Sequence, residues 1–150
     1  MAADPWQVYA SLVEFAGDGT VDLDNDTFVA ILLDSGHTPD VNTHDELADV
    51  VGDELASTNG YERQTLTGVT WVRSGANVTF TCNPFVFEAD GGPIVARYCA
   101  IFDDTSSGDK LVAICLLDDS PADVTVTDGN TLTITPHAST GLVHNQTNPA

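Results

Sequence analysis

The chain contains 150 residues, of which 23 are Asp or Glu and only 4 are Lys or Arg, so its formal net charge is −19. Four basic side chains cannot neutralise a phosphate backbone, and an anionic membrane surface repels such a chain, so we expect no nucleic acid and no membrane among its partners. Hydrophobic residues make up 42% of the sequence, which is enough for one globular domain over residues 1–150. No apolar run approaches the length that spans a bilayer, and the N-terminus has no basic start, so we expect no secretory signal.

The acidic residues are mostly of one type, because 18 of the 23 are Asp, and the chain has a single Lys. Asp adds charge with little apolar stem, and the scarcity of Lys removes long apolar stems from the surface. At 1 M salt the Debye length falls to about 3 Å, which screens the self-repulsion of such a chain. The composition favours a halophilic or marine source and a stability that rises with added salt. An ordinary acidic protein, or one whose partner is basic or shares cations, remains an alternative.

The three cysteines, Cys82, Cys99 and Cys115, form no CxxC pair and have no histidine at metal-binding spacing. An odd number argues against a full disulfide framework, so we interpret them as small buried hydrophobic residues. Cys82 supports this interpretation because it is in phase with Val78 and Phe80 on one face of a predicted strand. A bridge between Cys99 and Cys115 remains the alternative if their strands pair.

The N-terminal segment predicts a short helix. Residues 5–16, PWQVYASLVEFA, carry apolar side chains near the helical period, with Asp4 as the N-cap and Pro5 at the first helical position. The Gly-Asp-Gly sequence at 17–19 ends the helix. We therefore expect residues 1–17 to form an N-terminal helix or arm.

The remainder of the chain is typical of a β protein. An apolar, β-rich run predicts a strand at 27–34. Residues 35–60 are polar and turn-rich, so we expect a long loop excursion there, with one or two helical turns at 44–51. Further strands are predicted at 62–67, 69–73, 76–82, 94–103, 110–118, 122–127 and 131–136. Their spacing predicts a mainly β fold, an antiparallel β-sandwich or barrel of about seven to eight strands with a short N-terminal α-helix.

The last two predicted strands allow their register to be argued. A three-residue loop at 128–130 pairs Val126 with Leu132, which gives one aliphatic face and one threonine face. A two-residue Asp-Gly turn would mix the two faces instead. We therefore predict a hairpin with the three-residue loop and with Asn130 in the left-handed conformation.

Two strands, at 94–102 and 110–117, are apolar almost throughout. A strand with one solvated face should alternate, so we expect both faces of this hairpin to be covered. One face would pack on the domain core, and the other requires the N-terminal helix, a second sheet or a neighbouring subunit. Arg97 lies within this apolar run, so we expect a carboxylate beside it as an ion-pair partner, with a ligand clamp as the alternative.

One acidic segment resembles the opening of a calcium loop, because Asp22, Asp24 and Asp26 alternate along it. An EF-hand would then need Gly where Thr27 stands and Glu where Leu33 stands, and the segment leads into a strand. An acidic turn is therefore the favoured interpretation, and these three aspartates are the metal candidates.

No other pattern indicates chemistry. The sequence contains no HExxH, GxSxG, GxxxxGK[ST] or GxGxxG motif, so we expect no catalytic residue and no cofactor. The doublets at 103–104 and 118–119 flank the apolar hairpin and could share a cation, but doublets are expected in a chain this rich in Asp. The prediction is that the protein is not an enzyme.

Four phrases occur in order along residues 20–145: DLDNDTFVAILLD, NGYERQTLTGVTW, GGPIVARYCAIFDDTSSGDKLVAICLLD and VTVTDGNTLTITPHASTGLV. Together they resemble small virion structural proteins of tailed phages and of tailed viruses of haloarchaea. The resemblance implies a non-enzymatic role on the particle, as a capsid decoration or cement protein. It brings no catalytic residues, and contacts within 35–60 cannot be transferred from it.

The resemblance also implies partners and a place. The expected partners are the major capsid protein and further copies of the chain, as a homotrimer on the capsid exterior, after synthesis in the host cytoplasm. A −19 subunit inside the shell would face the negative charge of the genome, which favours the outer side. The N-terminal helix and the tail at 137–150 are the candidate attachment elements. The interface candidates are Trp6, Tyr9, Leu12, Tyr98 and Phe102.

Other functions stay open on the sequence alone. A tail, connector or spike component of the virion would have the same fold signals. A carbohydrate-binding or adhesive β-sandwich would need exposed aromatic side chains, of which Trp6, Trp71 and Tyr61 are among the few available. A small enzyme with an acidic site is the least favoured alternative.

Overall fold

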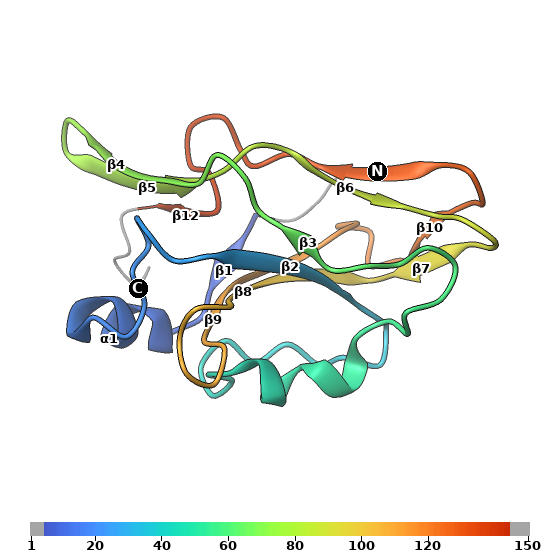
Figure 1. Cartoon of the computed structure of the whole chain (residues 1–150), viewed down its shortest axis with the longest axis horizontal. Helices are drawn as coiled ribbons and strands as arrows, with labels where there is room; N and C mark the ends of the chain where they lie inside the picture. The colour runs from blue at the N-terminus through green and yellow to red at the C-terminus, as the bar shows by residue number, and fades with distance from the viewer. Residues whose placement is uncertain (1–4, 145–150) are drawn as a thin grey trace.

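The computed structural model describes residues 5–144, and their fold is mainly β, with antiparallel strands in two facing layers (Figure 1). The first layer is a five-stranded sheet in the order β1-β9-β8-β2-β3, which we call the main sheet. Its strands are β1 (Gln7–Val8), β9 (Leu111–Leu116), β8 (Tyr98–Asp103), β2 (Phe28–Leu33) and β3 (Gln64–Thr65). The predicted fold class, an antiparallel β-sandwich-like fold with a short helix near the N-terminus, is confirmed.

The second layer consists of three smaller antiparallel units. A three-stranded sheet has the order β12-β5-β4, and two ladders pair β10 with β7 and β11 with β6. The strands are β4 (Thr70–Ser74), β5 (Asn77–Thr81), β6 (Phe85–Glu88), β7 (Ile94–Ala96), β10 (Val124–Val126), β11 (Thr131–Ile134) and β12 (Val143–His144). The twelve strands of the described residues exceed the predicted seven to eight because several are only two or three residues long.

The main sheet is buried on both faces. An inner core lies between the two layers and includes alternate residues of β2, such as Phe28 and Leu32, packed with Phe80 and Phe87. An outer core lies on the opposite face and includes the other β2 residues, Val29, Ile31 and Leu33, with Ala100, Phe102, Leu111 and Ile114. The prediction that both faces of the apolar hairpin are covered is therefore confirmed.

The cover of the outer face is the segment at 35–55, which we call the outer cover. It contributes Leu47 and Val50 to the outer core, with Val41 packed against it. Its two short 3-10 helices, η1 (Leu47–Asp49) and η2 (Val51–Asp53), agree with the helical turns predicted at 44–51. Figure 1 shows this segment beneath the main sheet, away from the second layer. The predicted covers were the helix, a second sheet or a subunit, so the identity of the cover is a correction.

The N-terminal helix begins later than predicted. α1 spans Ser11–Asp18 and ends at Gly19, whose φ of 85° is left-handed, while residues 7–8 form β1 instead of a first helical turn. The edge of β9 explains the difference, because it offers backbone hydrogen bonds to Gln7 and Val8 that a helix would forgo. Asp4, the predicted N-cap, lies outside the described residues. No helix within residues 5–144 has both the length and the apolar character needed to span a bilayer.

The predicted hairpin at 122–136 is wrong in its pairing. Val126 pairs with Ile94, and Leu132 pairs with Phe87, so β10 and β11 belong to different ladders. The Asn130 N–H donates to the Thr127 carbonyl across a tight turn, and Gly129, not Asn130, is left-handed. The predicted alternation is nevertheless right, because the aliphatic residues of both strands are buried and their threonines are exposed.

Two further strand predictions need correction. The predicted strand at 94–103 is two strands, because the chain passes at Arg97 from the β10–β7 ladder into the main sheet. β6 was not predicted, and neither was β12, which lies in the segment interpreted as the tail. β12 pairs with β5, so residues 143–144 are part of a sheet, and only 145–150 of the tail lie outside the described residues.

All three cysteines are buried and form no disulfide, as the sequence predicted. Cys99 and Cys115 face each other directly across β8 and β9, which is the pairing that the alternative required. Burial raises the pKa of Cys82 to about 11 and the pKa of Cys99 well above its ordinary value, so both side chains behave as neutral core residues.

Candidate interaction surface

The five interface candidates occupy different environments. Tyr9, Leu12 and Phe102 are almost fully buried within the chain, so they belong to its own core instead of to an exposed surface. Trp6 and Tyr98 are each only partly buried. Trp6 packs against the inner core and Tyr98 against the outer core, so the two lie on opposite faces of the main sheet. The candidates therefore do not form one contact surface.

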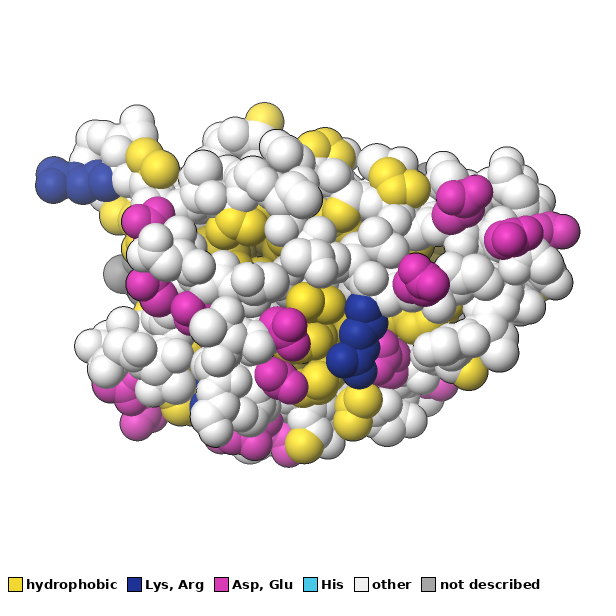
Figure 2. Space-filling view, viewed as in Figure 1, with side chains coloured by type: hydrophobic (Ala, Val, Ile, Leu, Met, Phe, Trp, Pro, Cys, Tyr) yellow, Lys and Arg dark blue, Asp and Glu magenta, His cyan; other side chains and the backbone are white. Residues whose placement is uncertain are grey.

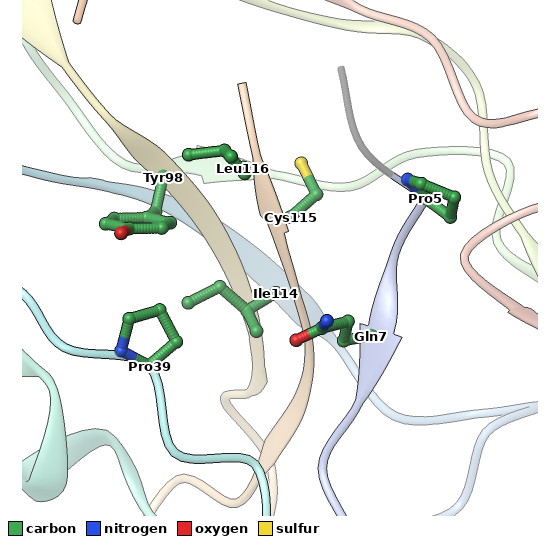
Figure 3. Close-up of a pocket in the computed structure, with 7 residues that line it drawn as sticks. All are labelled: Pro5, Gln7, Pro39, Tyr98, Ile114, Cys115 and Leu116. Atoms are coloured by element: carbon green, nitrogen blue, oxygen red, sulfur yellow. The ribbon is translucent and has the colours of Figure 1, made fainter. Parts of the chain in front are cut away.

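A surface hollow of about 190 Å³ lies beside Tyr98 (Figure 3). The figure shows Tyr98 and Pro39 on one side of the hollow, Pro5 and Gln7 on the other, and Ile114 between them. Its lining residues are Pro5, Gln7, Pro39, Tyr98, Ile114, Cys115 and Leu116. Six of the seven lining residues are apolar or aromatic and none is charged, although polar atoms supply about half of the exposed lining. The hollow is therefore a candidate for contact with another molecule.

Local sequence explains why the hollow forms where it does. β1 pairs with β9 only through Gln7 and Val8, and Pro5 has no N–H with which to extend the ladder. Among the described residues, the end of β9 is therefore bordered by side chains. Tyr98, the first residue of β8, is held by an edge contact with His37 of the outer cover, with ring centroids 5.7 Å apart. This contact fixes one wall of the hollow.

The acidic charge is spread over the surface, and the basic side chains are tied to particular partners. Figure 2 shows acidic side chains across one face, with small apolar areas between them. Arg97 Nε donates to Asp123 Oδ1 at 2.8 Å, so the predicted carboxylate partner is confirmed. The other pairs join Arg63 to Glu54 in a bidentate contact and Lys110 to Glu46, while Arg73 Nε donates to the Gly75 carbonyl.

Buried polar atoms gather beneath the outer cover. His37 Nδ1 lies 2.9 Å from Asp53 Oδ2, and the His37 and His44 rings are 5.8 Å apart. His37 Nε2, His44 Nδ1 and the Tyr9 hydroxyl are buried and have no hydrogen-bond partner among the described residues. Burial, and then the charge of Asp49, raises the pKa of Tyr9 far above its ordinary value, so this hydroxyl stays protonated.

The acidic turn at 22–26 is closed by its own hydrogen bonds. Asp22 Oδ1 accepts from the Asp24 and Asn25 backbone N–H groups, and Asp26 Oδ2 accepts from the Asp22 N–H at 2.8 Å. The Asn25 side chain, and then the Asp24 N–H, lower the pKa of Asp22. Within the described part of the chain, no three His, Cys, Asp or Glu side chains come together as a metal-binding group, so Asp22, Asp24 and Asp26 are not gathered around one point.

Sequence reasoning missed the position of Asp103. This residue ends β8 and is completely buried. Burial, and then the neighbouring Asp26 carboxyl, raises the pKa of Asp103 to about 6. The doublet at 103–104 was noted as a candidate for sharing a cation with 118–119. The structure instead places Asp103 beside the acidic turn 77 residues earlier in the chain. The signal that could have indicated its burial is that Asp103 directly follows the apolar residues of β8.

Comparison of the chain with models of known protein families, with curated protein sequences and with solved structures found no significant match.

Proposed function

We propose that the protein is a non-enzymatic virion structural protein that binds the outside of the major capsid shell of a tailed virus, as a decoration or cement protein. The proposal begins from the likeness of the strand phrases over residues 20–145. The hollow beside Tyr98 is the observation that carries it furthest, because it offers a concave contact surface without a charged side chain in its lining on an otherwise acidic molecule.

The size of the hollow supports a protein partner. Pockets that bind small molecules commonly enclose about 300–1,000 Å³, whereas this hollow has about 190 Å³. A volume of that order accepts one or two side chains of a neighbouring protein. Tyr98 suits such a contact, because tyrosine supplies large, rigid contact area and is enriched at interfaces.

The charge supports an exterior position and a saline environment. Copies of a −19 chain on one shell repel each other unless salt or cations screen them. A trimer of the chain at a symmetric position of the shell is the proposed assembly, with the N-terminal segment of β1 and α1 as the attachment element. This segment borders the hollow through Pro5 and Gln7.

Binding to undecorated capsids tests the proposal. Purified protein is mixed with undecorated capsids in about 2 M NaCl, and the bound fraction is measured by sedimentation for the wild type, Tyr98→Ala and Val72→Ala. We expect saturable binding, at least tenfold weaker for Tyr98→Ala, and unchanged for Val72→Ala, because Val72 is an exposed residue of β4 that does not line the hollow. Absence of binding by the wild type would overturn the capsid role.

Copy number separates the proposal from its closest rivals. Quantitative mass spectrometry of purified virions should give hundreds of copies per particle for a capsid decoration protein. Six or twelve copies would instead identify a connector or tail component. A specific hit on a glycan array, with no capsid binding, would favour the carbohydrate-binding alternative.

A further inference from the structure

The second layer has a free strand edge at one end of the molecule. In the three-stranded sheet β12-β5-β4, β4 pairs with β5 on one side, and no strand of the described residues pairs with its other side. The hairpin of β4 and β5 turns at Gly75, whose φ of 62° is left-handed, and Figure 1 shows this hairpin extending beyond the rest of the fold. An unpaired edge presents a row of backbone N–H and C=O groups that another strand can bind.

The hydrogen bonds of β5 show which backbone groups of β4 face the free edge. The Phe80 carbonyl accepts from the Leu142 N–H at 2.8 Å, so the backbone of Phe80 bonds on the side of β12 and not on the side of β4. Trp71 lies opposite Phe80, and such a pair in an antiparallel ladder is not hydrogen-bonded. The N–H and C=O groups of Trp71, and by alternation those of Arg73, therefore face the free edge.

This sheet is also an acid-free part of a strongly acidic chain. The two longest stretches of sequence without Asp or Glu are 63–87 and 129–150, and they supply all three of its strands. Arg73 is the only Lys or Arg in these strands, and it has no carboxylate partner among the described residues, because its Nε donates to the Gly75 carbonyl. Two copies of a −19 chain repel each other, so an edge without acidic side chains is where they can approach most closely.

We propose that two copies of the chain pair edge to edge through β4, in antiparallel orientation about a twofold axis at Val72. In this register Trp71 of each copy lies opposite Arg73 of the other, and the two residues exchange the backbone hydrogen bonds that face the edge. A charge on an edge strand ordinarily discourages pairing, but here each guanidinium meets an indole on the same face, to which a cation is attracted. Registers centred on Trp71 or on Arg73 would place like side chains opposite each other and lose this match.

The β4 contact is separate from the proposed capsid contact. The hollow is lined by Pro5, the outer cover and residues of β1, β8 and β9, none of which belongs to the β12-β5-β4 sheet. The pairing therefore does not depend on the proposed function, and it can link copies from two neighbouring trimers. Backbone groups of Trp71 and Arg73 carry the pairing, so Val72→Ala, which keeps a small apolar side chain at the axis, preserves it. A contact between two strands of five residues is small, so the dimer is weak and depends on concentration.

Directed disulfide formation tests the register. Val72→Cys introduces one exposed thiol, because the three native cysteines are buried. In the proposed pairing the two copies of residue 72 form a non-hydrogen-bonded pair with Cα atoms about 4.5 Å apart, which a disulfide can bridge. Oxidation at millimolar protein concentration in about 2 M NaCl, which screens the general repulsion, should convert most of Val72→Cys to a linked dimer.

Thr70→Cys is the matched control for this experiment. Thr70 lies on the same face of β4 and is also exposed, but it would pair with Ser74 of the second copy. The two copies of residue 70 are then four residues, or roughly 13 Å, apart along the strands. We expect the linked dimer of Thr70→Cys to form at least tenfold more slowly than that of Val72→Cys, and equal rates would overturn the proposed pairing.

Sedimentation equilibrium without capsids tests the backbone contact. The wild type should show a reversible monomer–dimer equilibrium, and Arg73→Pro should weaken it at least tenfold. Proline removes only an N–H that faces the free edge, where proline is tolerated, so circular dichroism should show the wild-type fold. A wild type that stays monomeric at millimolar concentration would overturn the pairing, and so would an unchanged dimer in Arg73→Pro. Because no capsid is present, these failures are distinct from a failure of capsid binding.

Discussion

The inner and outer faces of the main sheet are buried in different ways. The inner face packs against a second layer of strands, with large aromatic side chains such as Phe80 and Phe87 fully enclosed. The outer face packs against the outer cover, a segment with only two 3-10 turns, through aliphatic side chains such as Leu47 and Val50. Strand ladders therefore support the inner core, whereas the outer core depends on a segment with little regular structure of its own.

Polar contacts hold the outer cover in place. His37 contacts Asp53, Glu54 receives the bidentate contact from Arg63, and Glu46 pairs with Lys110. Two of the four basic side chains of the chain are thus used to attach this one segment. In a protein with so few cations, the comparison teaches that two of the ion pairs lie at the two points where the outer cover forms an isolated backbone bridge, Leu33 with Glu54 and Glu46 with Lys110.

The largest effect is expected from the inner core. Phe80→Ala removes a fully buried ring whose centroid is 4.9 Å from that of Phe28, in an edge-to-face contact. A buried Phe→Ala substitution costs about 3–5 kcal/mol, and we expect the loss in a single cooperative transition during urea unfolding. A cost near 1 kcal/mol would mean that the inner core does not dominate stability.

A smaller and more local effect is expected from the outer cover. Leu47→Ala should cost about 3 kcal/mol at most, since a Leu→Ala cavity costs about 2–5 kcal/mol and Leu47 is at the rim of burial. Hydrogen exchange should speed up at 45–54 and remain unchanged in β5. Equal acceleration in β5 would contradict the separation of the two faces, because the cover would then unfold together with the sheet.

The strand pattern of the fold could be predicted from the sequence, but the pairing could not. The alternation of Val124 and Val126 with Thr125 correctly gave the buried face of β10, because side-chain direction is local. Its partner is β7 and not β11, and that choice depends on long-range packing that no local pattern encodes. β6 was missed although Phe85 and Phe87 alternate with exposed neighbours, so in this case the signal was present.

For the candidate sites too, the local features could be predicted from the sequence and the long-range contacts could not. The acidic turn at 22–26 and the apolar strand ending at Asp103 were each visible in the sequence. Their meeting depends on hydrogen bonds between Thr27 and the 104–105 loop, 77 or more residues apart, which no spacing rule predicts. Tyr9 and Phe102 were selected for their size and apolar character, but these properties are shared by interface and core residues.

Asp103 should make the stability of the protein depend on pH, which the apolar cores on the two faces of the main sheet do not. Because its pKa is raised, Asp103 contributes stability that is fully present below its unfolded pKa, near 4, and is lost as the pH rises through about 6. Asp103→Asn lacks this titration. The unfolding free energy of Asp103→Asn relative to the wild type should therefore increase by about 2 kcal/mol between pH 4 and 7.5.

The difference in unfolding free energy between the wild type and Asp103→Asn isolates the contribution of the Asp103 carboxyl group. Asp18, Asp22, Asp40, Asp49 and Asp118 have lowered pKa values, so they contribute stability that is lost at low pH. They are common to both proteins and cancel in the comparison. A flat difference from pH 4 to 7.5 would show that Asp103 is not held protonated by its burial beside Asp26.

The smallest effect is expected from a polar anchor of the outer cover, and it should depend on salt. Glu46→Gln leaves the mostly buried Lys110 ammonium without its carboxylate, while Glu46 itself is 40% exposed. We expect a loss of about 1 kcal/mol in 0.1 M NaCl that shrinks toward zero in 2 M NaCl, because salt screens the pair. Glu62→Gln is the control, since Glu62 is exposed and its loss only relieves the net negative charge.

Thermal melts of the same proteins compare two opposite effects of salt, one on the stability of the whole protein and one on the Lys110–Glu46 pair. The wild type should melt at a higher temperature in 2 M than in 0.1 M NaCl, because screening relieves the repulsion among 23 acidic side chains. The Lys110–Glu46 pair loses strength under the same conditions. The contrary outcome is that the loss of unfolding free energy in Glu46→Gln stays the same in 2 M NaCl. That result would show that packing at Leu47 and Val50 holds the outer cover more than charge does. The two faces of the main sheet would then differ only in the size of their buried side chains.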